Sequence, residues 1–198
     1  MYPSSILPPV PLRPAASVTA AFTQAGALDY RSAAQYVSRL PYRRNRDASN
    51  VLAVHEEQCG TCSSKHAILR RLALEQGLDV SLVLGVFEMT SVNTPAVRPV
   101  LEKHGLSALP EAHCYLRTSA NRVDATRDTG ASTPRWLTLF CEEEITAEQI
   151  GEYKTRLHRN FLTRWIAQSG AAGSRNLNEI WEIREECIRA LSLEWSRE

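Results

Sequence analysis

The sequence predicts an α+β fold, in which helices accompany strands that pair as an antiparallel hairpin. Apolar residues follow helical spacing from Ala67 to Gln76, and β-branched and apolar residues dominate 79–88. Two short strand-like segments, 112–117 and 122–125, flank a polar turn that is typical of a hairpin. The C-terminal quarter of the chain is amphipathic at helical spacing and predicts additional helices.

Composition excludes several classes of protein. The chain has 198 residues, enough for one domain with a substantial core. Apolar residues make up 43% and charged residues 23%, which is ordinary for a soluble globular protein. Because 23 Lys and Arg nearly balance 22 Asp and Glu, the net charge is only +1, and we expect no nucleic-acid partner.

The chain also lacks the patterns of membrane and secreted proteins. No apolar run approaches the roughly 20 residues that cross a bilayer, so we expect no membrane partner. The first residues lack the positive region and uninterrupted apolar stretch of a secretory signal. Five scattered cysteines do not form a disulfide framework. We therefore expect a reducing, cytoplasmic setting.

Three regions are predicted along the chain. Residues 1–14 hold five of the ten prolines and predict an extended lead-in. Residues 15–145 form the core, which includes a helix from Asp29 to Leu40 that ends before proline. Residues 146–198 form a helical extension packed on the core.

Cys62 carries the first chemical signal. It follows a small-residue turn, Gly60-Thr61, and opens the helix that is predicted to end near Gln76, before Gly77. Backbone N–H groups and the helix dipole at that end favour thiolate over thiol. Cys62 is therefore a candidate nucleophile.

Two strand residues complete a catalytic constellation. His113 and Asp124 lie in the two segments of the predicted hairpin, which brings a histidine beside a carboxylate. Cysteine, histidine and aspartate in this order suggest a nucleophile, a base and an orienting carboxylate.

These residues also fit other kinds of site. Cys59 and Cys62 form a C-x-x-C pair, which also occurs in redox and zinc sites. The polar segment before the pair does not favour a redox site, and a zinc site would need two more ligands at close spacing. His66 lies one helical turn after Cys62 and is a rival base without an orienting carboxylate. Lys65 is assigned to solvation or packing, and Asp128 is a second carboxylate near Asp124.

Three blocks of the sequence resemble the transglutaminase-like superfamily. They are Gly60-Thr-Cys-Ser-Ser-Lys-His-Ala67, Ala112-His-Cys-Tyr-Leu116 and Arg122-Val-Asp-Ala-Thr126, and they agree with the family in order and spacing. The resemblance covers roughly residues 45–127. Within the superfamily, the chain looks like a small microbial, stand-alone member. It implies a papain-like core, in which a helix bearing the nucleophile packs on an antiparallel sheet.

The resemblance also implies a function. Cys62, His113 and Asp124 would serve as nucleophile, base and orienting acid of a cysteine hydrolase or acyltransferase acting on a peptide, amide or thioester. Such enzymes complete an oxyanion hole with an upstream side chain, for which Gln58, Asn50 and Asn45 are the candidates. We expect no cofactor and no metal. The alternative is an inactive binding module that retains the fold.

Overall fold

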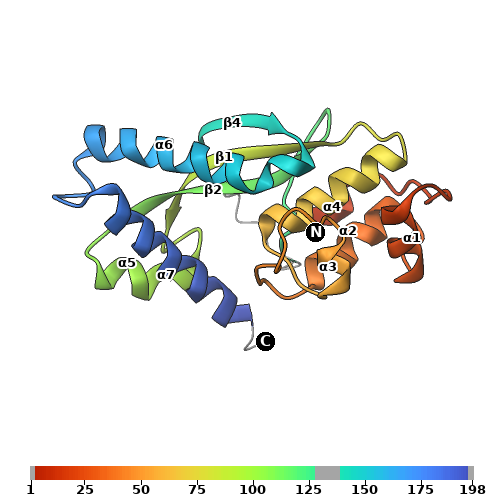
Figure 1. Cartoon of the computed structure of the whole chain (residues 1–198), viewed down its shortest axis with the longest axis horizontal. Helices are drawn as coiled ribbons and strands as arrows, with labels where there is room; N and C mark the ends of the chain where they lie inside the picture. The colour runs from red at the N-terminus through yellow and green to blue at the C-terminus, as the bar shows by residue number, and fades with distance from the viewer. Residues whose placement is uncertain (1–2, 128–138, 196–198) are drawn as a thin grey trace. The chain divides into compact units, whose positions relative to one another are not determined.

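In a computed structural model of the chain, residues 3–127 and 139–195 are described. The structure combines helices with a four-stranded antiparallel sheet of order β3-β2-β1-β4 (Figure 1). The predicted mixture of helices and antiparallel strands is therefore confirmed. The strands are β1 (Ser81–Thr90), β2 (Ala108–Arg117), β3 (Arg122–Val123) and β4 (Leu139–Ile145).

Backbone contacts divide the chain into two compact units. Unit 1 comprises Met1–Leu84, His113–Ser132 and Glu143–Gly151. Unit 2 comprises Gly85–Ala112, Thr133–Glu142 and Glu152–Glu198. The division into 1–14, 15–145 and 146–198 stays a prediction.

Helices make up most of unit 1 (Figure 1). They are η1 (Pro3–Ile6), α1 (Ser17–Gln24), α2 (Tyr30–Arg39), α3 (Ala53–Glu56), α4 (Cys62–Glu75) and η4 (Ala147–Ile150). The predicted helix before Pro41 is confirmed as α2. It begins where the Asp29 carboxylate accepts the Ser32 N–H at 2.6 Å, which satisfies a donor that the first turn cannot pair.

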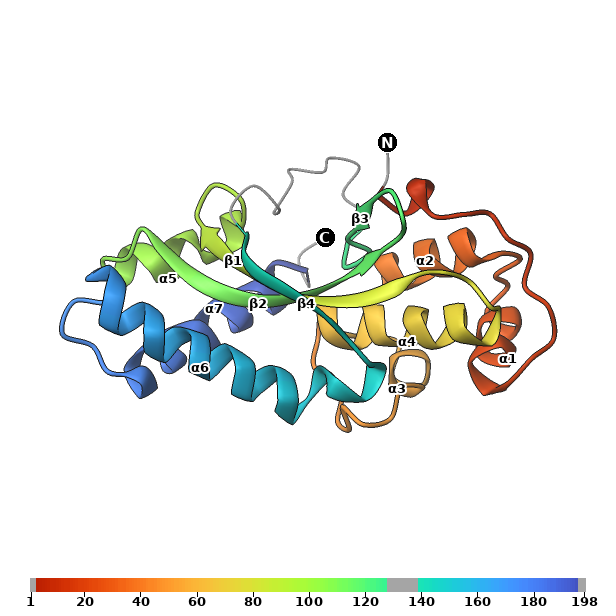
Figure 2. The ribbon, with the colours of Figure 1, turned by 90° about the horizontal axis from the view of Figure 1, so that it is seen from above.

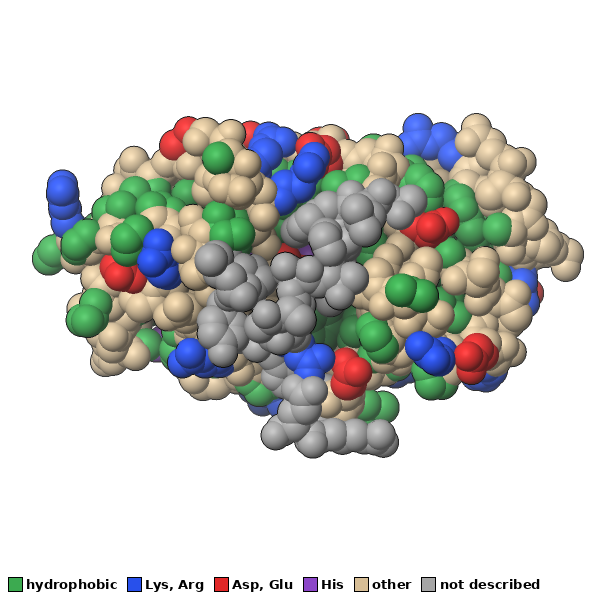
Figure 3. All heavy atoms as spheres, turned by 180° about the vertical axis from the view of Figure 1, so that it is seen from behind, with side chains coloured by type: hydrophobic (Ala, Val, Ile, Leu, Met, Phe, Trp, Pro, Cys, Tyr) green, Lys and Arg blue, Asp and Glu red, His purple; other side chains and the backbone are tan. Residues whose placement is uncertain are grey.

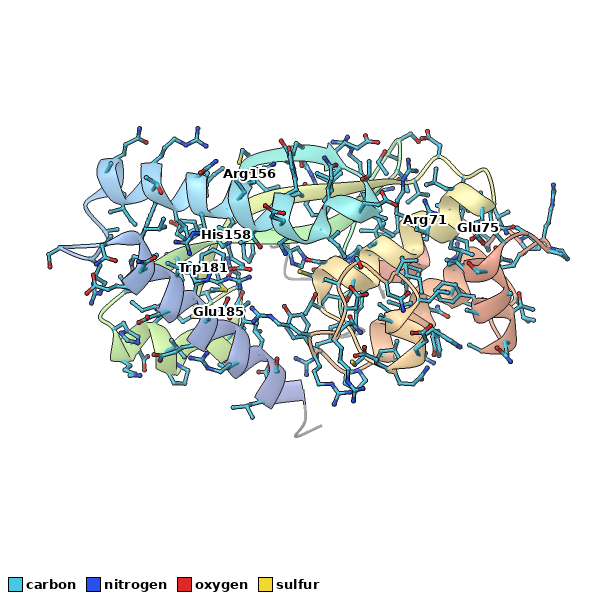
Figure 4. The ribbon with its side chains drawn as sticks, in the orientation of Figure 1. Arg71, Glu75, Arg156, His158, Trp181 and Glu185 are labelled. Atoms are coloured by element: carbon cyan, nitrogen blue, oxygen red, sulfur yellow. The ribbon has the colours of Figure 1, made fainter. Side chains whose placement is uncertain are left out.

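Helix α4 is the centre of unit 1. Its apolar residues Ile68, Leu69 and Leu72 are fully buried, as their spacing predicts. The helix ends before Gly77, whose φ of +65° suits the left-handed C-terminal turn. In Figure 4, Glu75 lies at the end of α4 beside α1, where its carboxylate accepts the Thr19 N–H at 2.7 Å. The Glu75 carboxylate at the N-terminus of α1 thus links α4 to α1.

The proline-rich lead-in is tied to unit 1 by specific contacts. The Leu7 side chain is fully buried. The backbone then runs beside the start of α2, where Tyr30 N donates to Val10 O at 3.0 Å and Leu12 N to Leu28 O at 3.0 Å. Apolar residues between the prolines therefore supply packing that proline composition alone does not predict.

Strand β1 is an interior strand of the sheet, as its β-branched sequence predicts. The hairpin is also confirmed: Leu116 pairs with Val123, and the Thr118 N–H donates to Asn121 O at 2.9 Å. Strand β4 was not predicted. It lies at an edge of the sheet and is largely exposed, including Cys141.

Unit 2 has its own hydrophobic core. Its helices are η2 (Pro95–Val97), α5 (Arg98–Lys103), α6 (Glu152–Ser169) and α7 (Leu177–Trp195). Figure 2 shows α6 and α7 side by side, and they pack in the structure. The core residues are Phe87, Met89, Val97, Leu101, Leu106, Leu109, Leu162, Ala172, Ile180, Ile183 and Cys187. The buried face of α6 consists of Lys154, His158 and Leu162.

Charge is dispersed on the face drawn in Figure 3. Acidic and basic side chains are scattered there among hydrophobic and neutral ones. Among the helices within residues 3–127 and 139–195, none has both the length and the apolar composition needed to cross a bilayer.

Candidate active site

A tight turn delivers the chain to Cys62. Gln58 adopts a positive φ of 50°, and Gly60 N then donates to Pro41 O at 3.0 Å. A Cβ on Gly60 would lie 2.9 Å from Ser64 Oγ and 3.0 Å from Lys65 Cγ. Glycine at residue 60 therefore lets the turn approach the first turn of α4 without displacing the Ser64 and Lys65 side chains.

Cys62 is the first residue of α4 and is buried. Thr61 is the N-cap, and its own N–H donates to Ser64 Oγ at 3.0 Å in a capping box. The first four N–H groups of a helix have no carbonyl partner within the helix, so this end carries partial positive charge. The sequence prediction of a cysteine at a helix start is confirmed.

His113 lies on β2 and is oriented by Asp124. Its Nε2 lies 2.9 Å from Asp124 Oδ2, which assigns the proton on Nε2 to this hydrogen bond. The other ring nitrogen, Nδ1, is therefore the one available for the side-chain hydrogen bond between His113 and Cys62. The Tyr115 ring lies beside the imidazole, 6.4 Å between centroids and inclined by 23°.

Electrostatics favour a protonated His113. Burial by itself lowers the pKa of the imidazole, because it disfavours charge. The charges of Asp124 and Cys62, with hydrogen bonds to both, outweigh burial and raise the pKa to about 9. The site can thus hold a thiolate beside an imidazolium near neutral pH.

Asp124 is placed by the backbone that follows β3. The sequence placed this residue on a strand, but β3 ends at Val123. The chain leaves the sheet because Asp124 Oδ1 accepts the Thr126 N–H at 2.9 Å, a local turn that competes with strand pairing. One carboxylate oxygen thus fixes the loop while the other holds His113.

His66, the predicted rival base, makes other contacts. Its Nδ1 lies 2.7 Å from Cys62 O, and its Nε2 accepts the Ala125 N–H at 2.7 Å. The distance of 3.6 Å from Nε2 to Asp124 Oδ1 is not an ion pair, since Nε2 is already an acceptor. Burial is the main cause that lowers the His66 pKa to about 4. The structure assigns His66 to a neutral state.

Lys65 is fully buried, which sequence analysis missed. Its Nζ donates to Leu40 O at 2.5 Å and to Thr126 O at 2.7 Å. Burial lowers its pKa to about 7, although the charges of Asp124 and Cys62 raise it in part. A signal was present: Lys65 precedes Ile68, Leu69 and Leu72 by three, four and seven residues and so shares their buried face.

Cys59, the other cysteine of the C-x-x-C pair, is a buried free thiol. Its sulfur accepts from Arg43 Nε at 3.4 Å and lies 3.8 Å from Asn45 Nδ2. Among residues 3–127 and 139–195, no group of three or more His, Cys, Asp or Glu side chains is arranged to hold a metal ion. Cys59 thus serves as a hydrogen-bond acceptor of the turn.

The three predicted oxyanion donors are bound to other acceptors. Asn45 Nδ2 donates to Ala53 O and Cys59 O at 3.2 and 3.0 Å, and so braces the loop before the turn. Asn50 Nδ2 donates to Glu56 Oε2 at 2.9 Å. Gln58 Nε2 donates to Tyr36 Oη and His55 O. These bonds occupy both N–H groups of Asn45 and Gln58.

Replacing Gln58 with asparagine is expected to leave the reactivity of Cys62 within about threefold of wild type. Asparagine tolerates the left-handed backbone but shortens the amide. The measurement is the acylation rate of Cys62 by an activated ester. Loss of an oxyanion donor would instead lower that rate by about 10²–10³. The matched control is Tyr36→Phe, which removes the hydroxyl that accepts from Gln58 Nε2 and that also lies 3.4 Å from His55 Nδ1.

The remaining carboxylate, Asp128, lies outside the described residues. Comparison of the chain with models of known families, with curated proteins and with solved structures finds no match.

Proposed function

We propose that this protein is a transglutaminase-like cysteine enzyme that transfers acyl groups through a thioester on Cys62. The hydrogen-bonded series Cys62, His113 and Asp124 carries the proposal, with the His113 pKa raised to about 9. The proposed fold is a papain-like core, with α4 bearing the nucleophile and β2 the base. Helices α6 and α7 would be additions to that core.

In the first half-reaction, the Cys62 thiolate attacks the carbonyl carbon of a peptide, amide or thioester. The electron pair of the C=O bond moves to oxygen, where the N-terminal dipole of α4 and the Cys62 N–H favour the negative charge. The bond to the leaving amine or thiol then breaks. His113 gives its proton to that group, and an acyl thioester remains on Cys62.

In the second half-reaction, neutral His113 takes a proton from water or from an acceptor amine. The resulting nucleophile attacks the thioester, and the carbon–sulfur bond breaks. Cys62 returns as thiolate beside the His113 imidazolium. Asp124 keeps the Nε2 proton in place throughout, so that Nδ1 faces the sulfur in both half-reactions.

Incubation with 4-nitrophenyl acetate is expected to place a single acetyl group on Cys62. The measurement combines the release of 4-nitrophenol with intact and peptide mass spectrometry. Cys62→Ala is expected to lower the burst to background, a loss of about 10⁴-fold or more. Cys59→Ser changes the neighbouring thiol of the same motif and should retain the burst.

Two outcomes would count against the proposal. Equal acylation of wild type and Cys62→Ala would remove Cys62 as nucleophile. Alkylation of Cys62 no faster than that of an ordinary buried thiol would favour an inactive binding module with the same fold.

A further inference from the structure

His66 joins two parts of the candidate site through its two ring nitrogens. It lies one turn after Cys62 on α4 and is fully buried. Nδ1 lies 2.7 Å from the carbonyl oxygen of Cys62, and Nε2 lies 2.7 Å from the backbone nitrogen of Ala125. Ala125 directly follows Asp124, so the imidazole spans from the cysteine residue to the acid segment.

The chemistry of the partners determines the tautomer of His66. A backbone N–H can only donate, so Nε2 must accept from Ala125 and carry no proton. A backbone carbonyl can only accept, so Nδ1 must carry the proton and donate it to Cys62 O. The neutral Nδ1–H form satisfies both bonds, and an imidazolium would lose the bond to Ala125.

Lys65 contacts the same segment from the adjacent position of α4. Its Nζ donates to Thr126 O at 2.7 Å, one residue beyond the N–H that His66 accepts. The segment is therefore held by a donor and an acceptor from consecutive helix residues. His66 differs from Lys65 because its second bond returns to the cysteine residue, whereas that of Lys65 goes to Leu40 O.

We propose that neutral His66 is a positioning residue, which holds the Asp124 segment at a fixed place relative to Cys62. The proposal rests on the function proposed above. Asp124 Oδ2 in turn holds His113 Nε2, so a displacement of Ala125 would move the imidazole away from the thiol. A rigid ring with two short hydrogen bonds suits this role, because it has few rotamers to restrict.

Two measurements test the proposal. The first is ¹⁵N NMR of the histidine rings in the wild-type protein, where His66 is expected as a neutral Nδ1–H tautomer that does not titrate between about pH 5 and 8. The second is the pH profile of Cys62 alkylation by iodoacetamide. His66→Phe keeps a ring but loses both bonds, and should move the profile midpoint upward by about 1–2 pH units.

Matched variants separate positioning from general damage. His66→Gln places an acceptor near the Nε2 position and should restore most of the wild-type profile. His66→Asn restores only a donor near the Nδ1 position and should behave like His66→Phe. His158→Phe removes another buried histidine, whose Nε2 lies 2.9 Å from Pro110 O in unit 2, and should leave the profile unchanged.

Each outcome is decisive for one of the two proposals. A folded His66→Phe protein with the wild-type profile overturns the positioning role and leaves the proposed function intact. If His66→Phe does not fold, an Nε2–H or charged His66 in the wild-type spectra overturns it instead. If His113→Gln leaves the pH profile of Cys62 alkylation the same as in the wild type, the proposed function itself is overturned.

Discussion

Replacing His113 with glutamine is expected to raise the midpoint of Cys62 alkylation by about 2 pH units or more. In the wild type, the imidazolium stabilises the thiolate until His113 loses its proton near its pKa of about 9. The variant lacks that charge and should titrate like an ordinary buried thiol, at or above about pH 8.5. At pH 6 the alkylation rate should fall by about tenfold, since the weaker nucleophilicity of a low-pKa thiolate offsets part of the gain.

The experiment needs two precautions. Cys141 is an exposed cysteine, so a Cys141→Ser background isolates the signal of Cys62. His104→Gln changes a histidine of unit 2 that lies 3.2 Å from Glu186, and should leave the profile unaltered. A single transition at the same pH in wild type and His113→Gln would contradict the ion pair.

The same pKa shift has a consequence for stability. His113 binds its proton more tightly in the folded than in the unfolded protein, because its pKa is raised from 6.5 to about 9. Its contribution to the free energy of unfolding is therefore fully present below about pH 6.5 and is lost as the pH rises through 9. His113→Gln should remove that part of the pH dependence.

Replacing Glu111 with glutamine is expected to destabilise unit 2 by about 3–5 kcal/mol. Glu111 and Arg184 are both buried and form a bidentate pair, with Nε to Oε2 at 2.8 Å and Nη2 to Oε1 at 2.6 Å. Trp181 packs beside the Arg184 guanidinium at 5.2 Å and lies next to His158 (Figure 4). Removing the Glu111 carboxylate leaves the buried Arg184 guanidinium without its bidentate partner, with Glu185 Oε1 still 2.7 Å from Nη1. Urea unfolding at pH 7 measures the loss.

The effect of Glu111→Gln should depend on pH in a defined direction. Burial raises the Glu111 pKa, but Arg184 and the neighbouring His158 and Lys154 outweigh it and lower the pKa to about 2. The stabilisation is thus fully present above about pH 4.5 and is lost as the pH falls through 2. The difference between wild type and variant should shrink over that interval.

Two controls define the buried pair. Glu111→Leu combined with Arg184→Met should cost less than either single change, because neither member of the buried pair then leaves the other's charge behind. Glu185 loses its 2.7 Å contact with Arg184 Nη1, but its side chain is 23% exposed and can be solvated. Glu186→Gln removes the partner of the exposed Lys103, at 2.9 Å, and should cost less than about 1 kcal/mol. Equal losses from Glu111→Gln and Glu186→Gln would contradict the assignment.

The sequence predicted elements whose pattern is local. Helix α4, the hairpin of β2 and β3, and the interior strand β1 follow from helical spacing, a polar turn and β-branched residues. Strand β4 was missed because three consecutive glutamates, 142–144, obscure any alternation. Such residues suit an exposed edge strand, which forms only because β1 offers a partner.

The sequence does not predict the buried polar face of α6, for a related reason. The apolar residues Tyr153, Leu157, Phe161 and Trp165 recur at helical spacing, but Lys154 and His158 occupy the buried positions. A polar side chain can be buried where partners from other elements satisfy it, as Pro110 O does for His158. Those partners are distant in sequence, so periodicity cannot reveal them.

The candidate site likewise has one part that local sequence predicts and another that depends on the tertiary structure. By itself the sequence determined that Cys62 opens a helix and that His113 lies in a hairpin with a carboxylate nearby, because helix starts and tight turns are encoded by adjacent residues. Only the tertiary structure decided which nitrogen of His113 bonds to Asp124. It also decided that Lys65 and His66 form hydrogen bonds to the residues that follow Asp124. The contacts of Lys65 and His66 join residues about 60 positions apart, and directional hydrogen bonds depend on where folding brings each donor and acceptor.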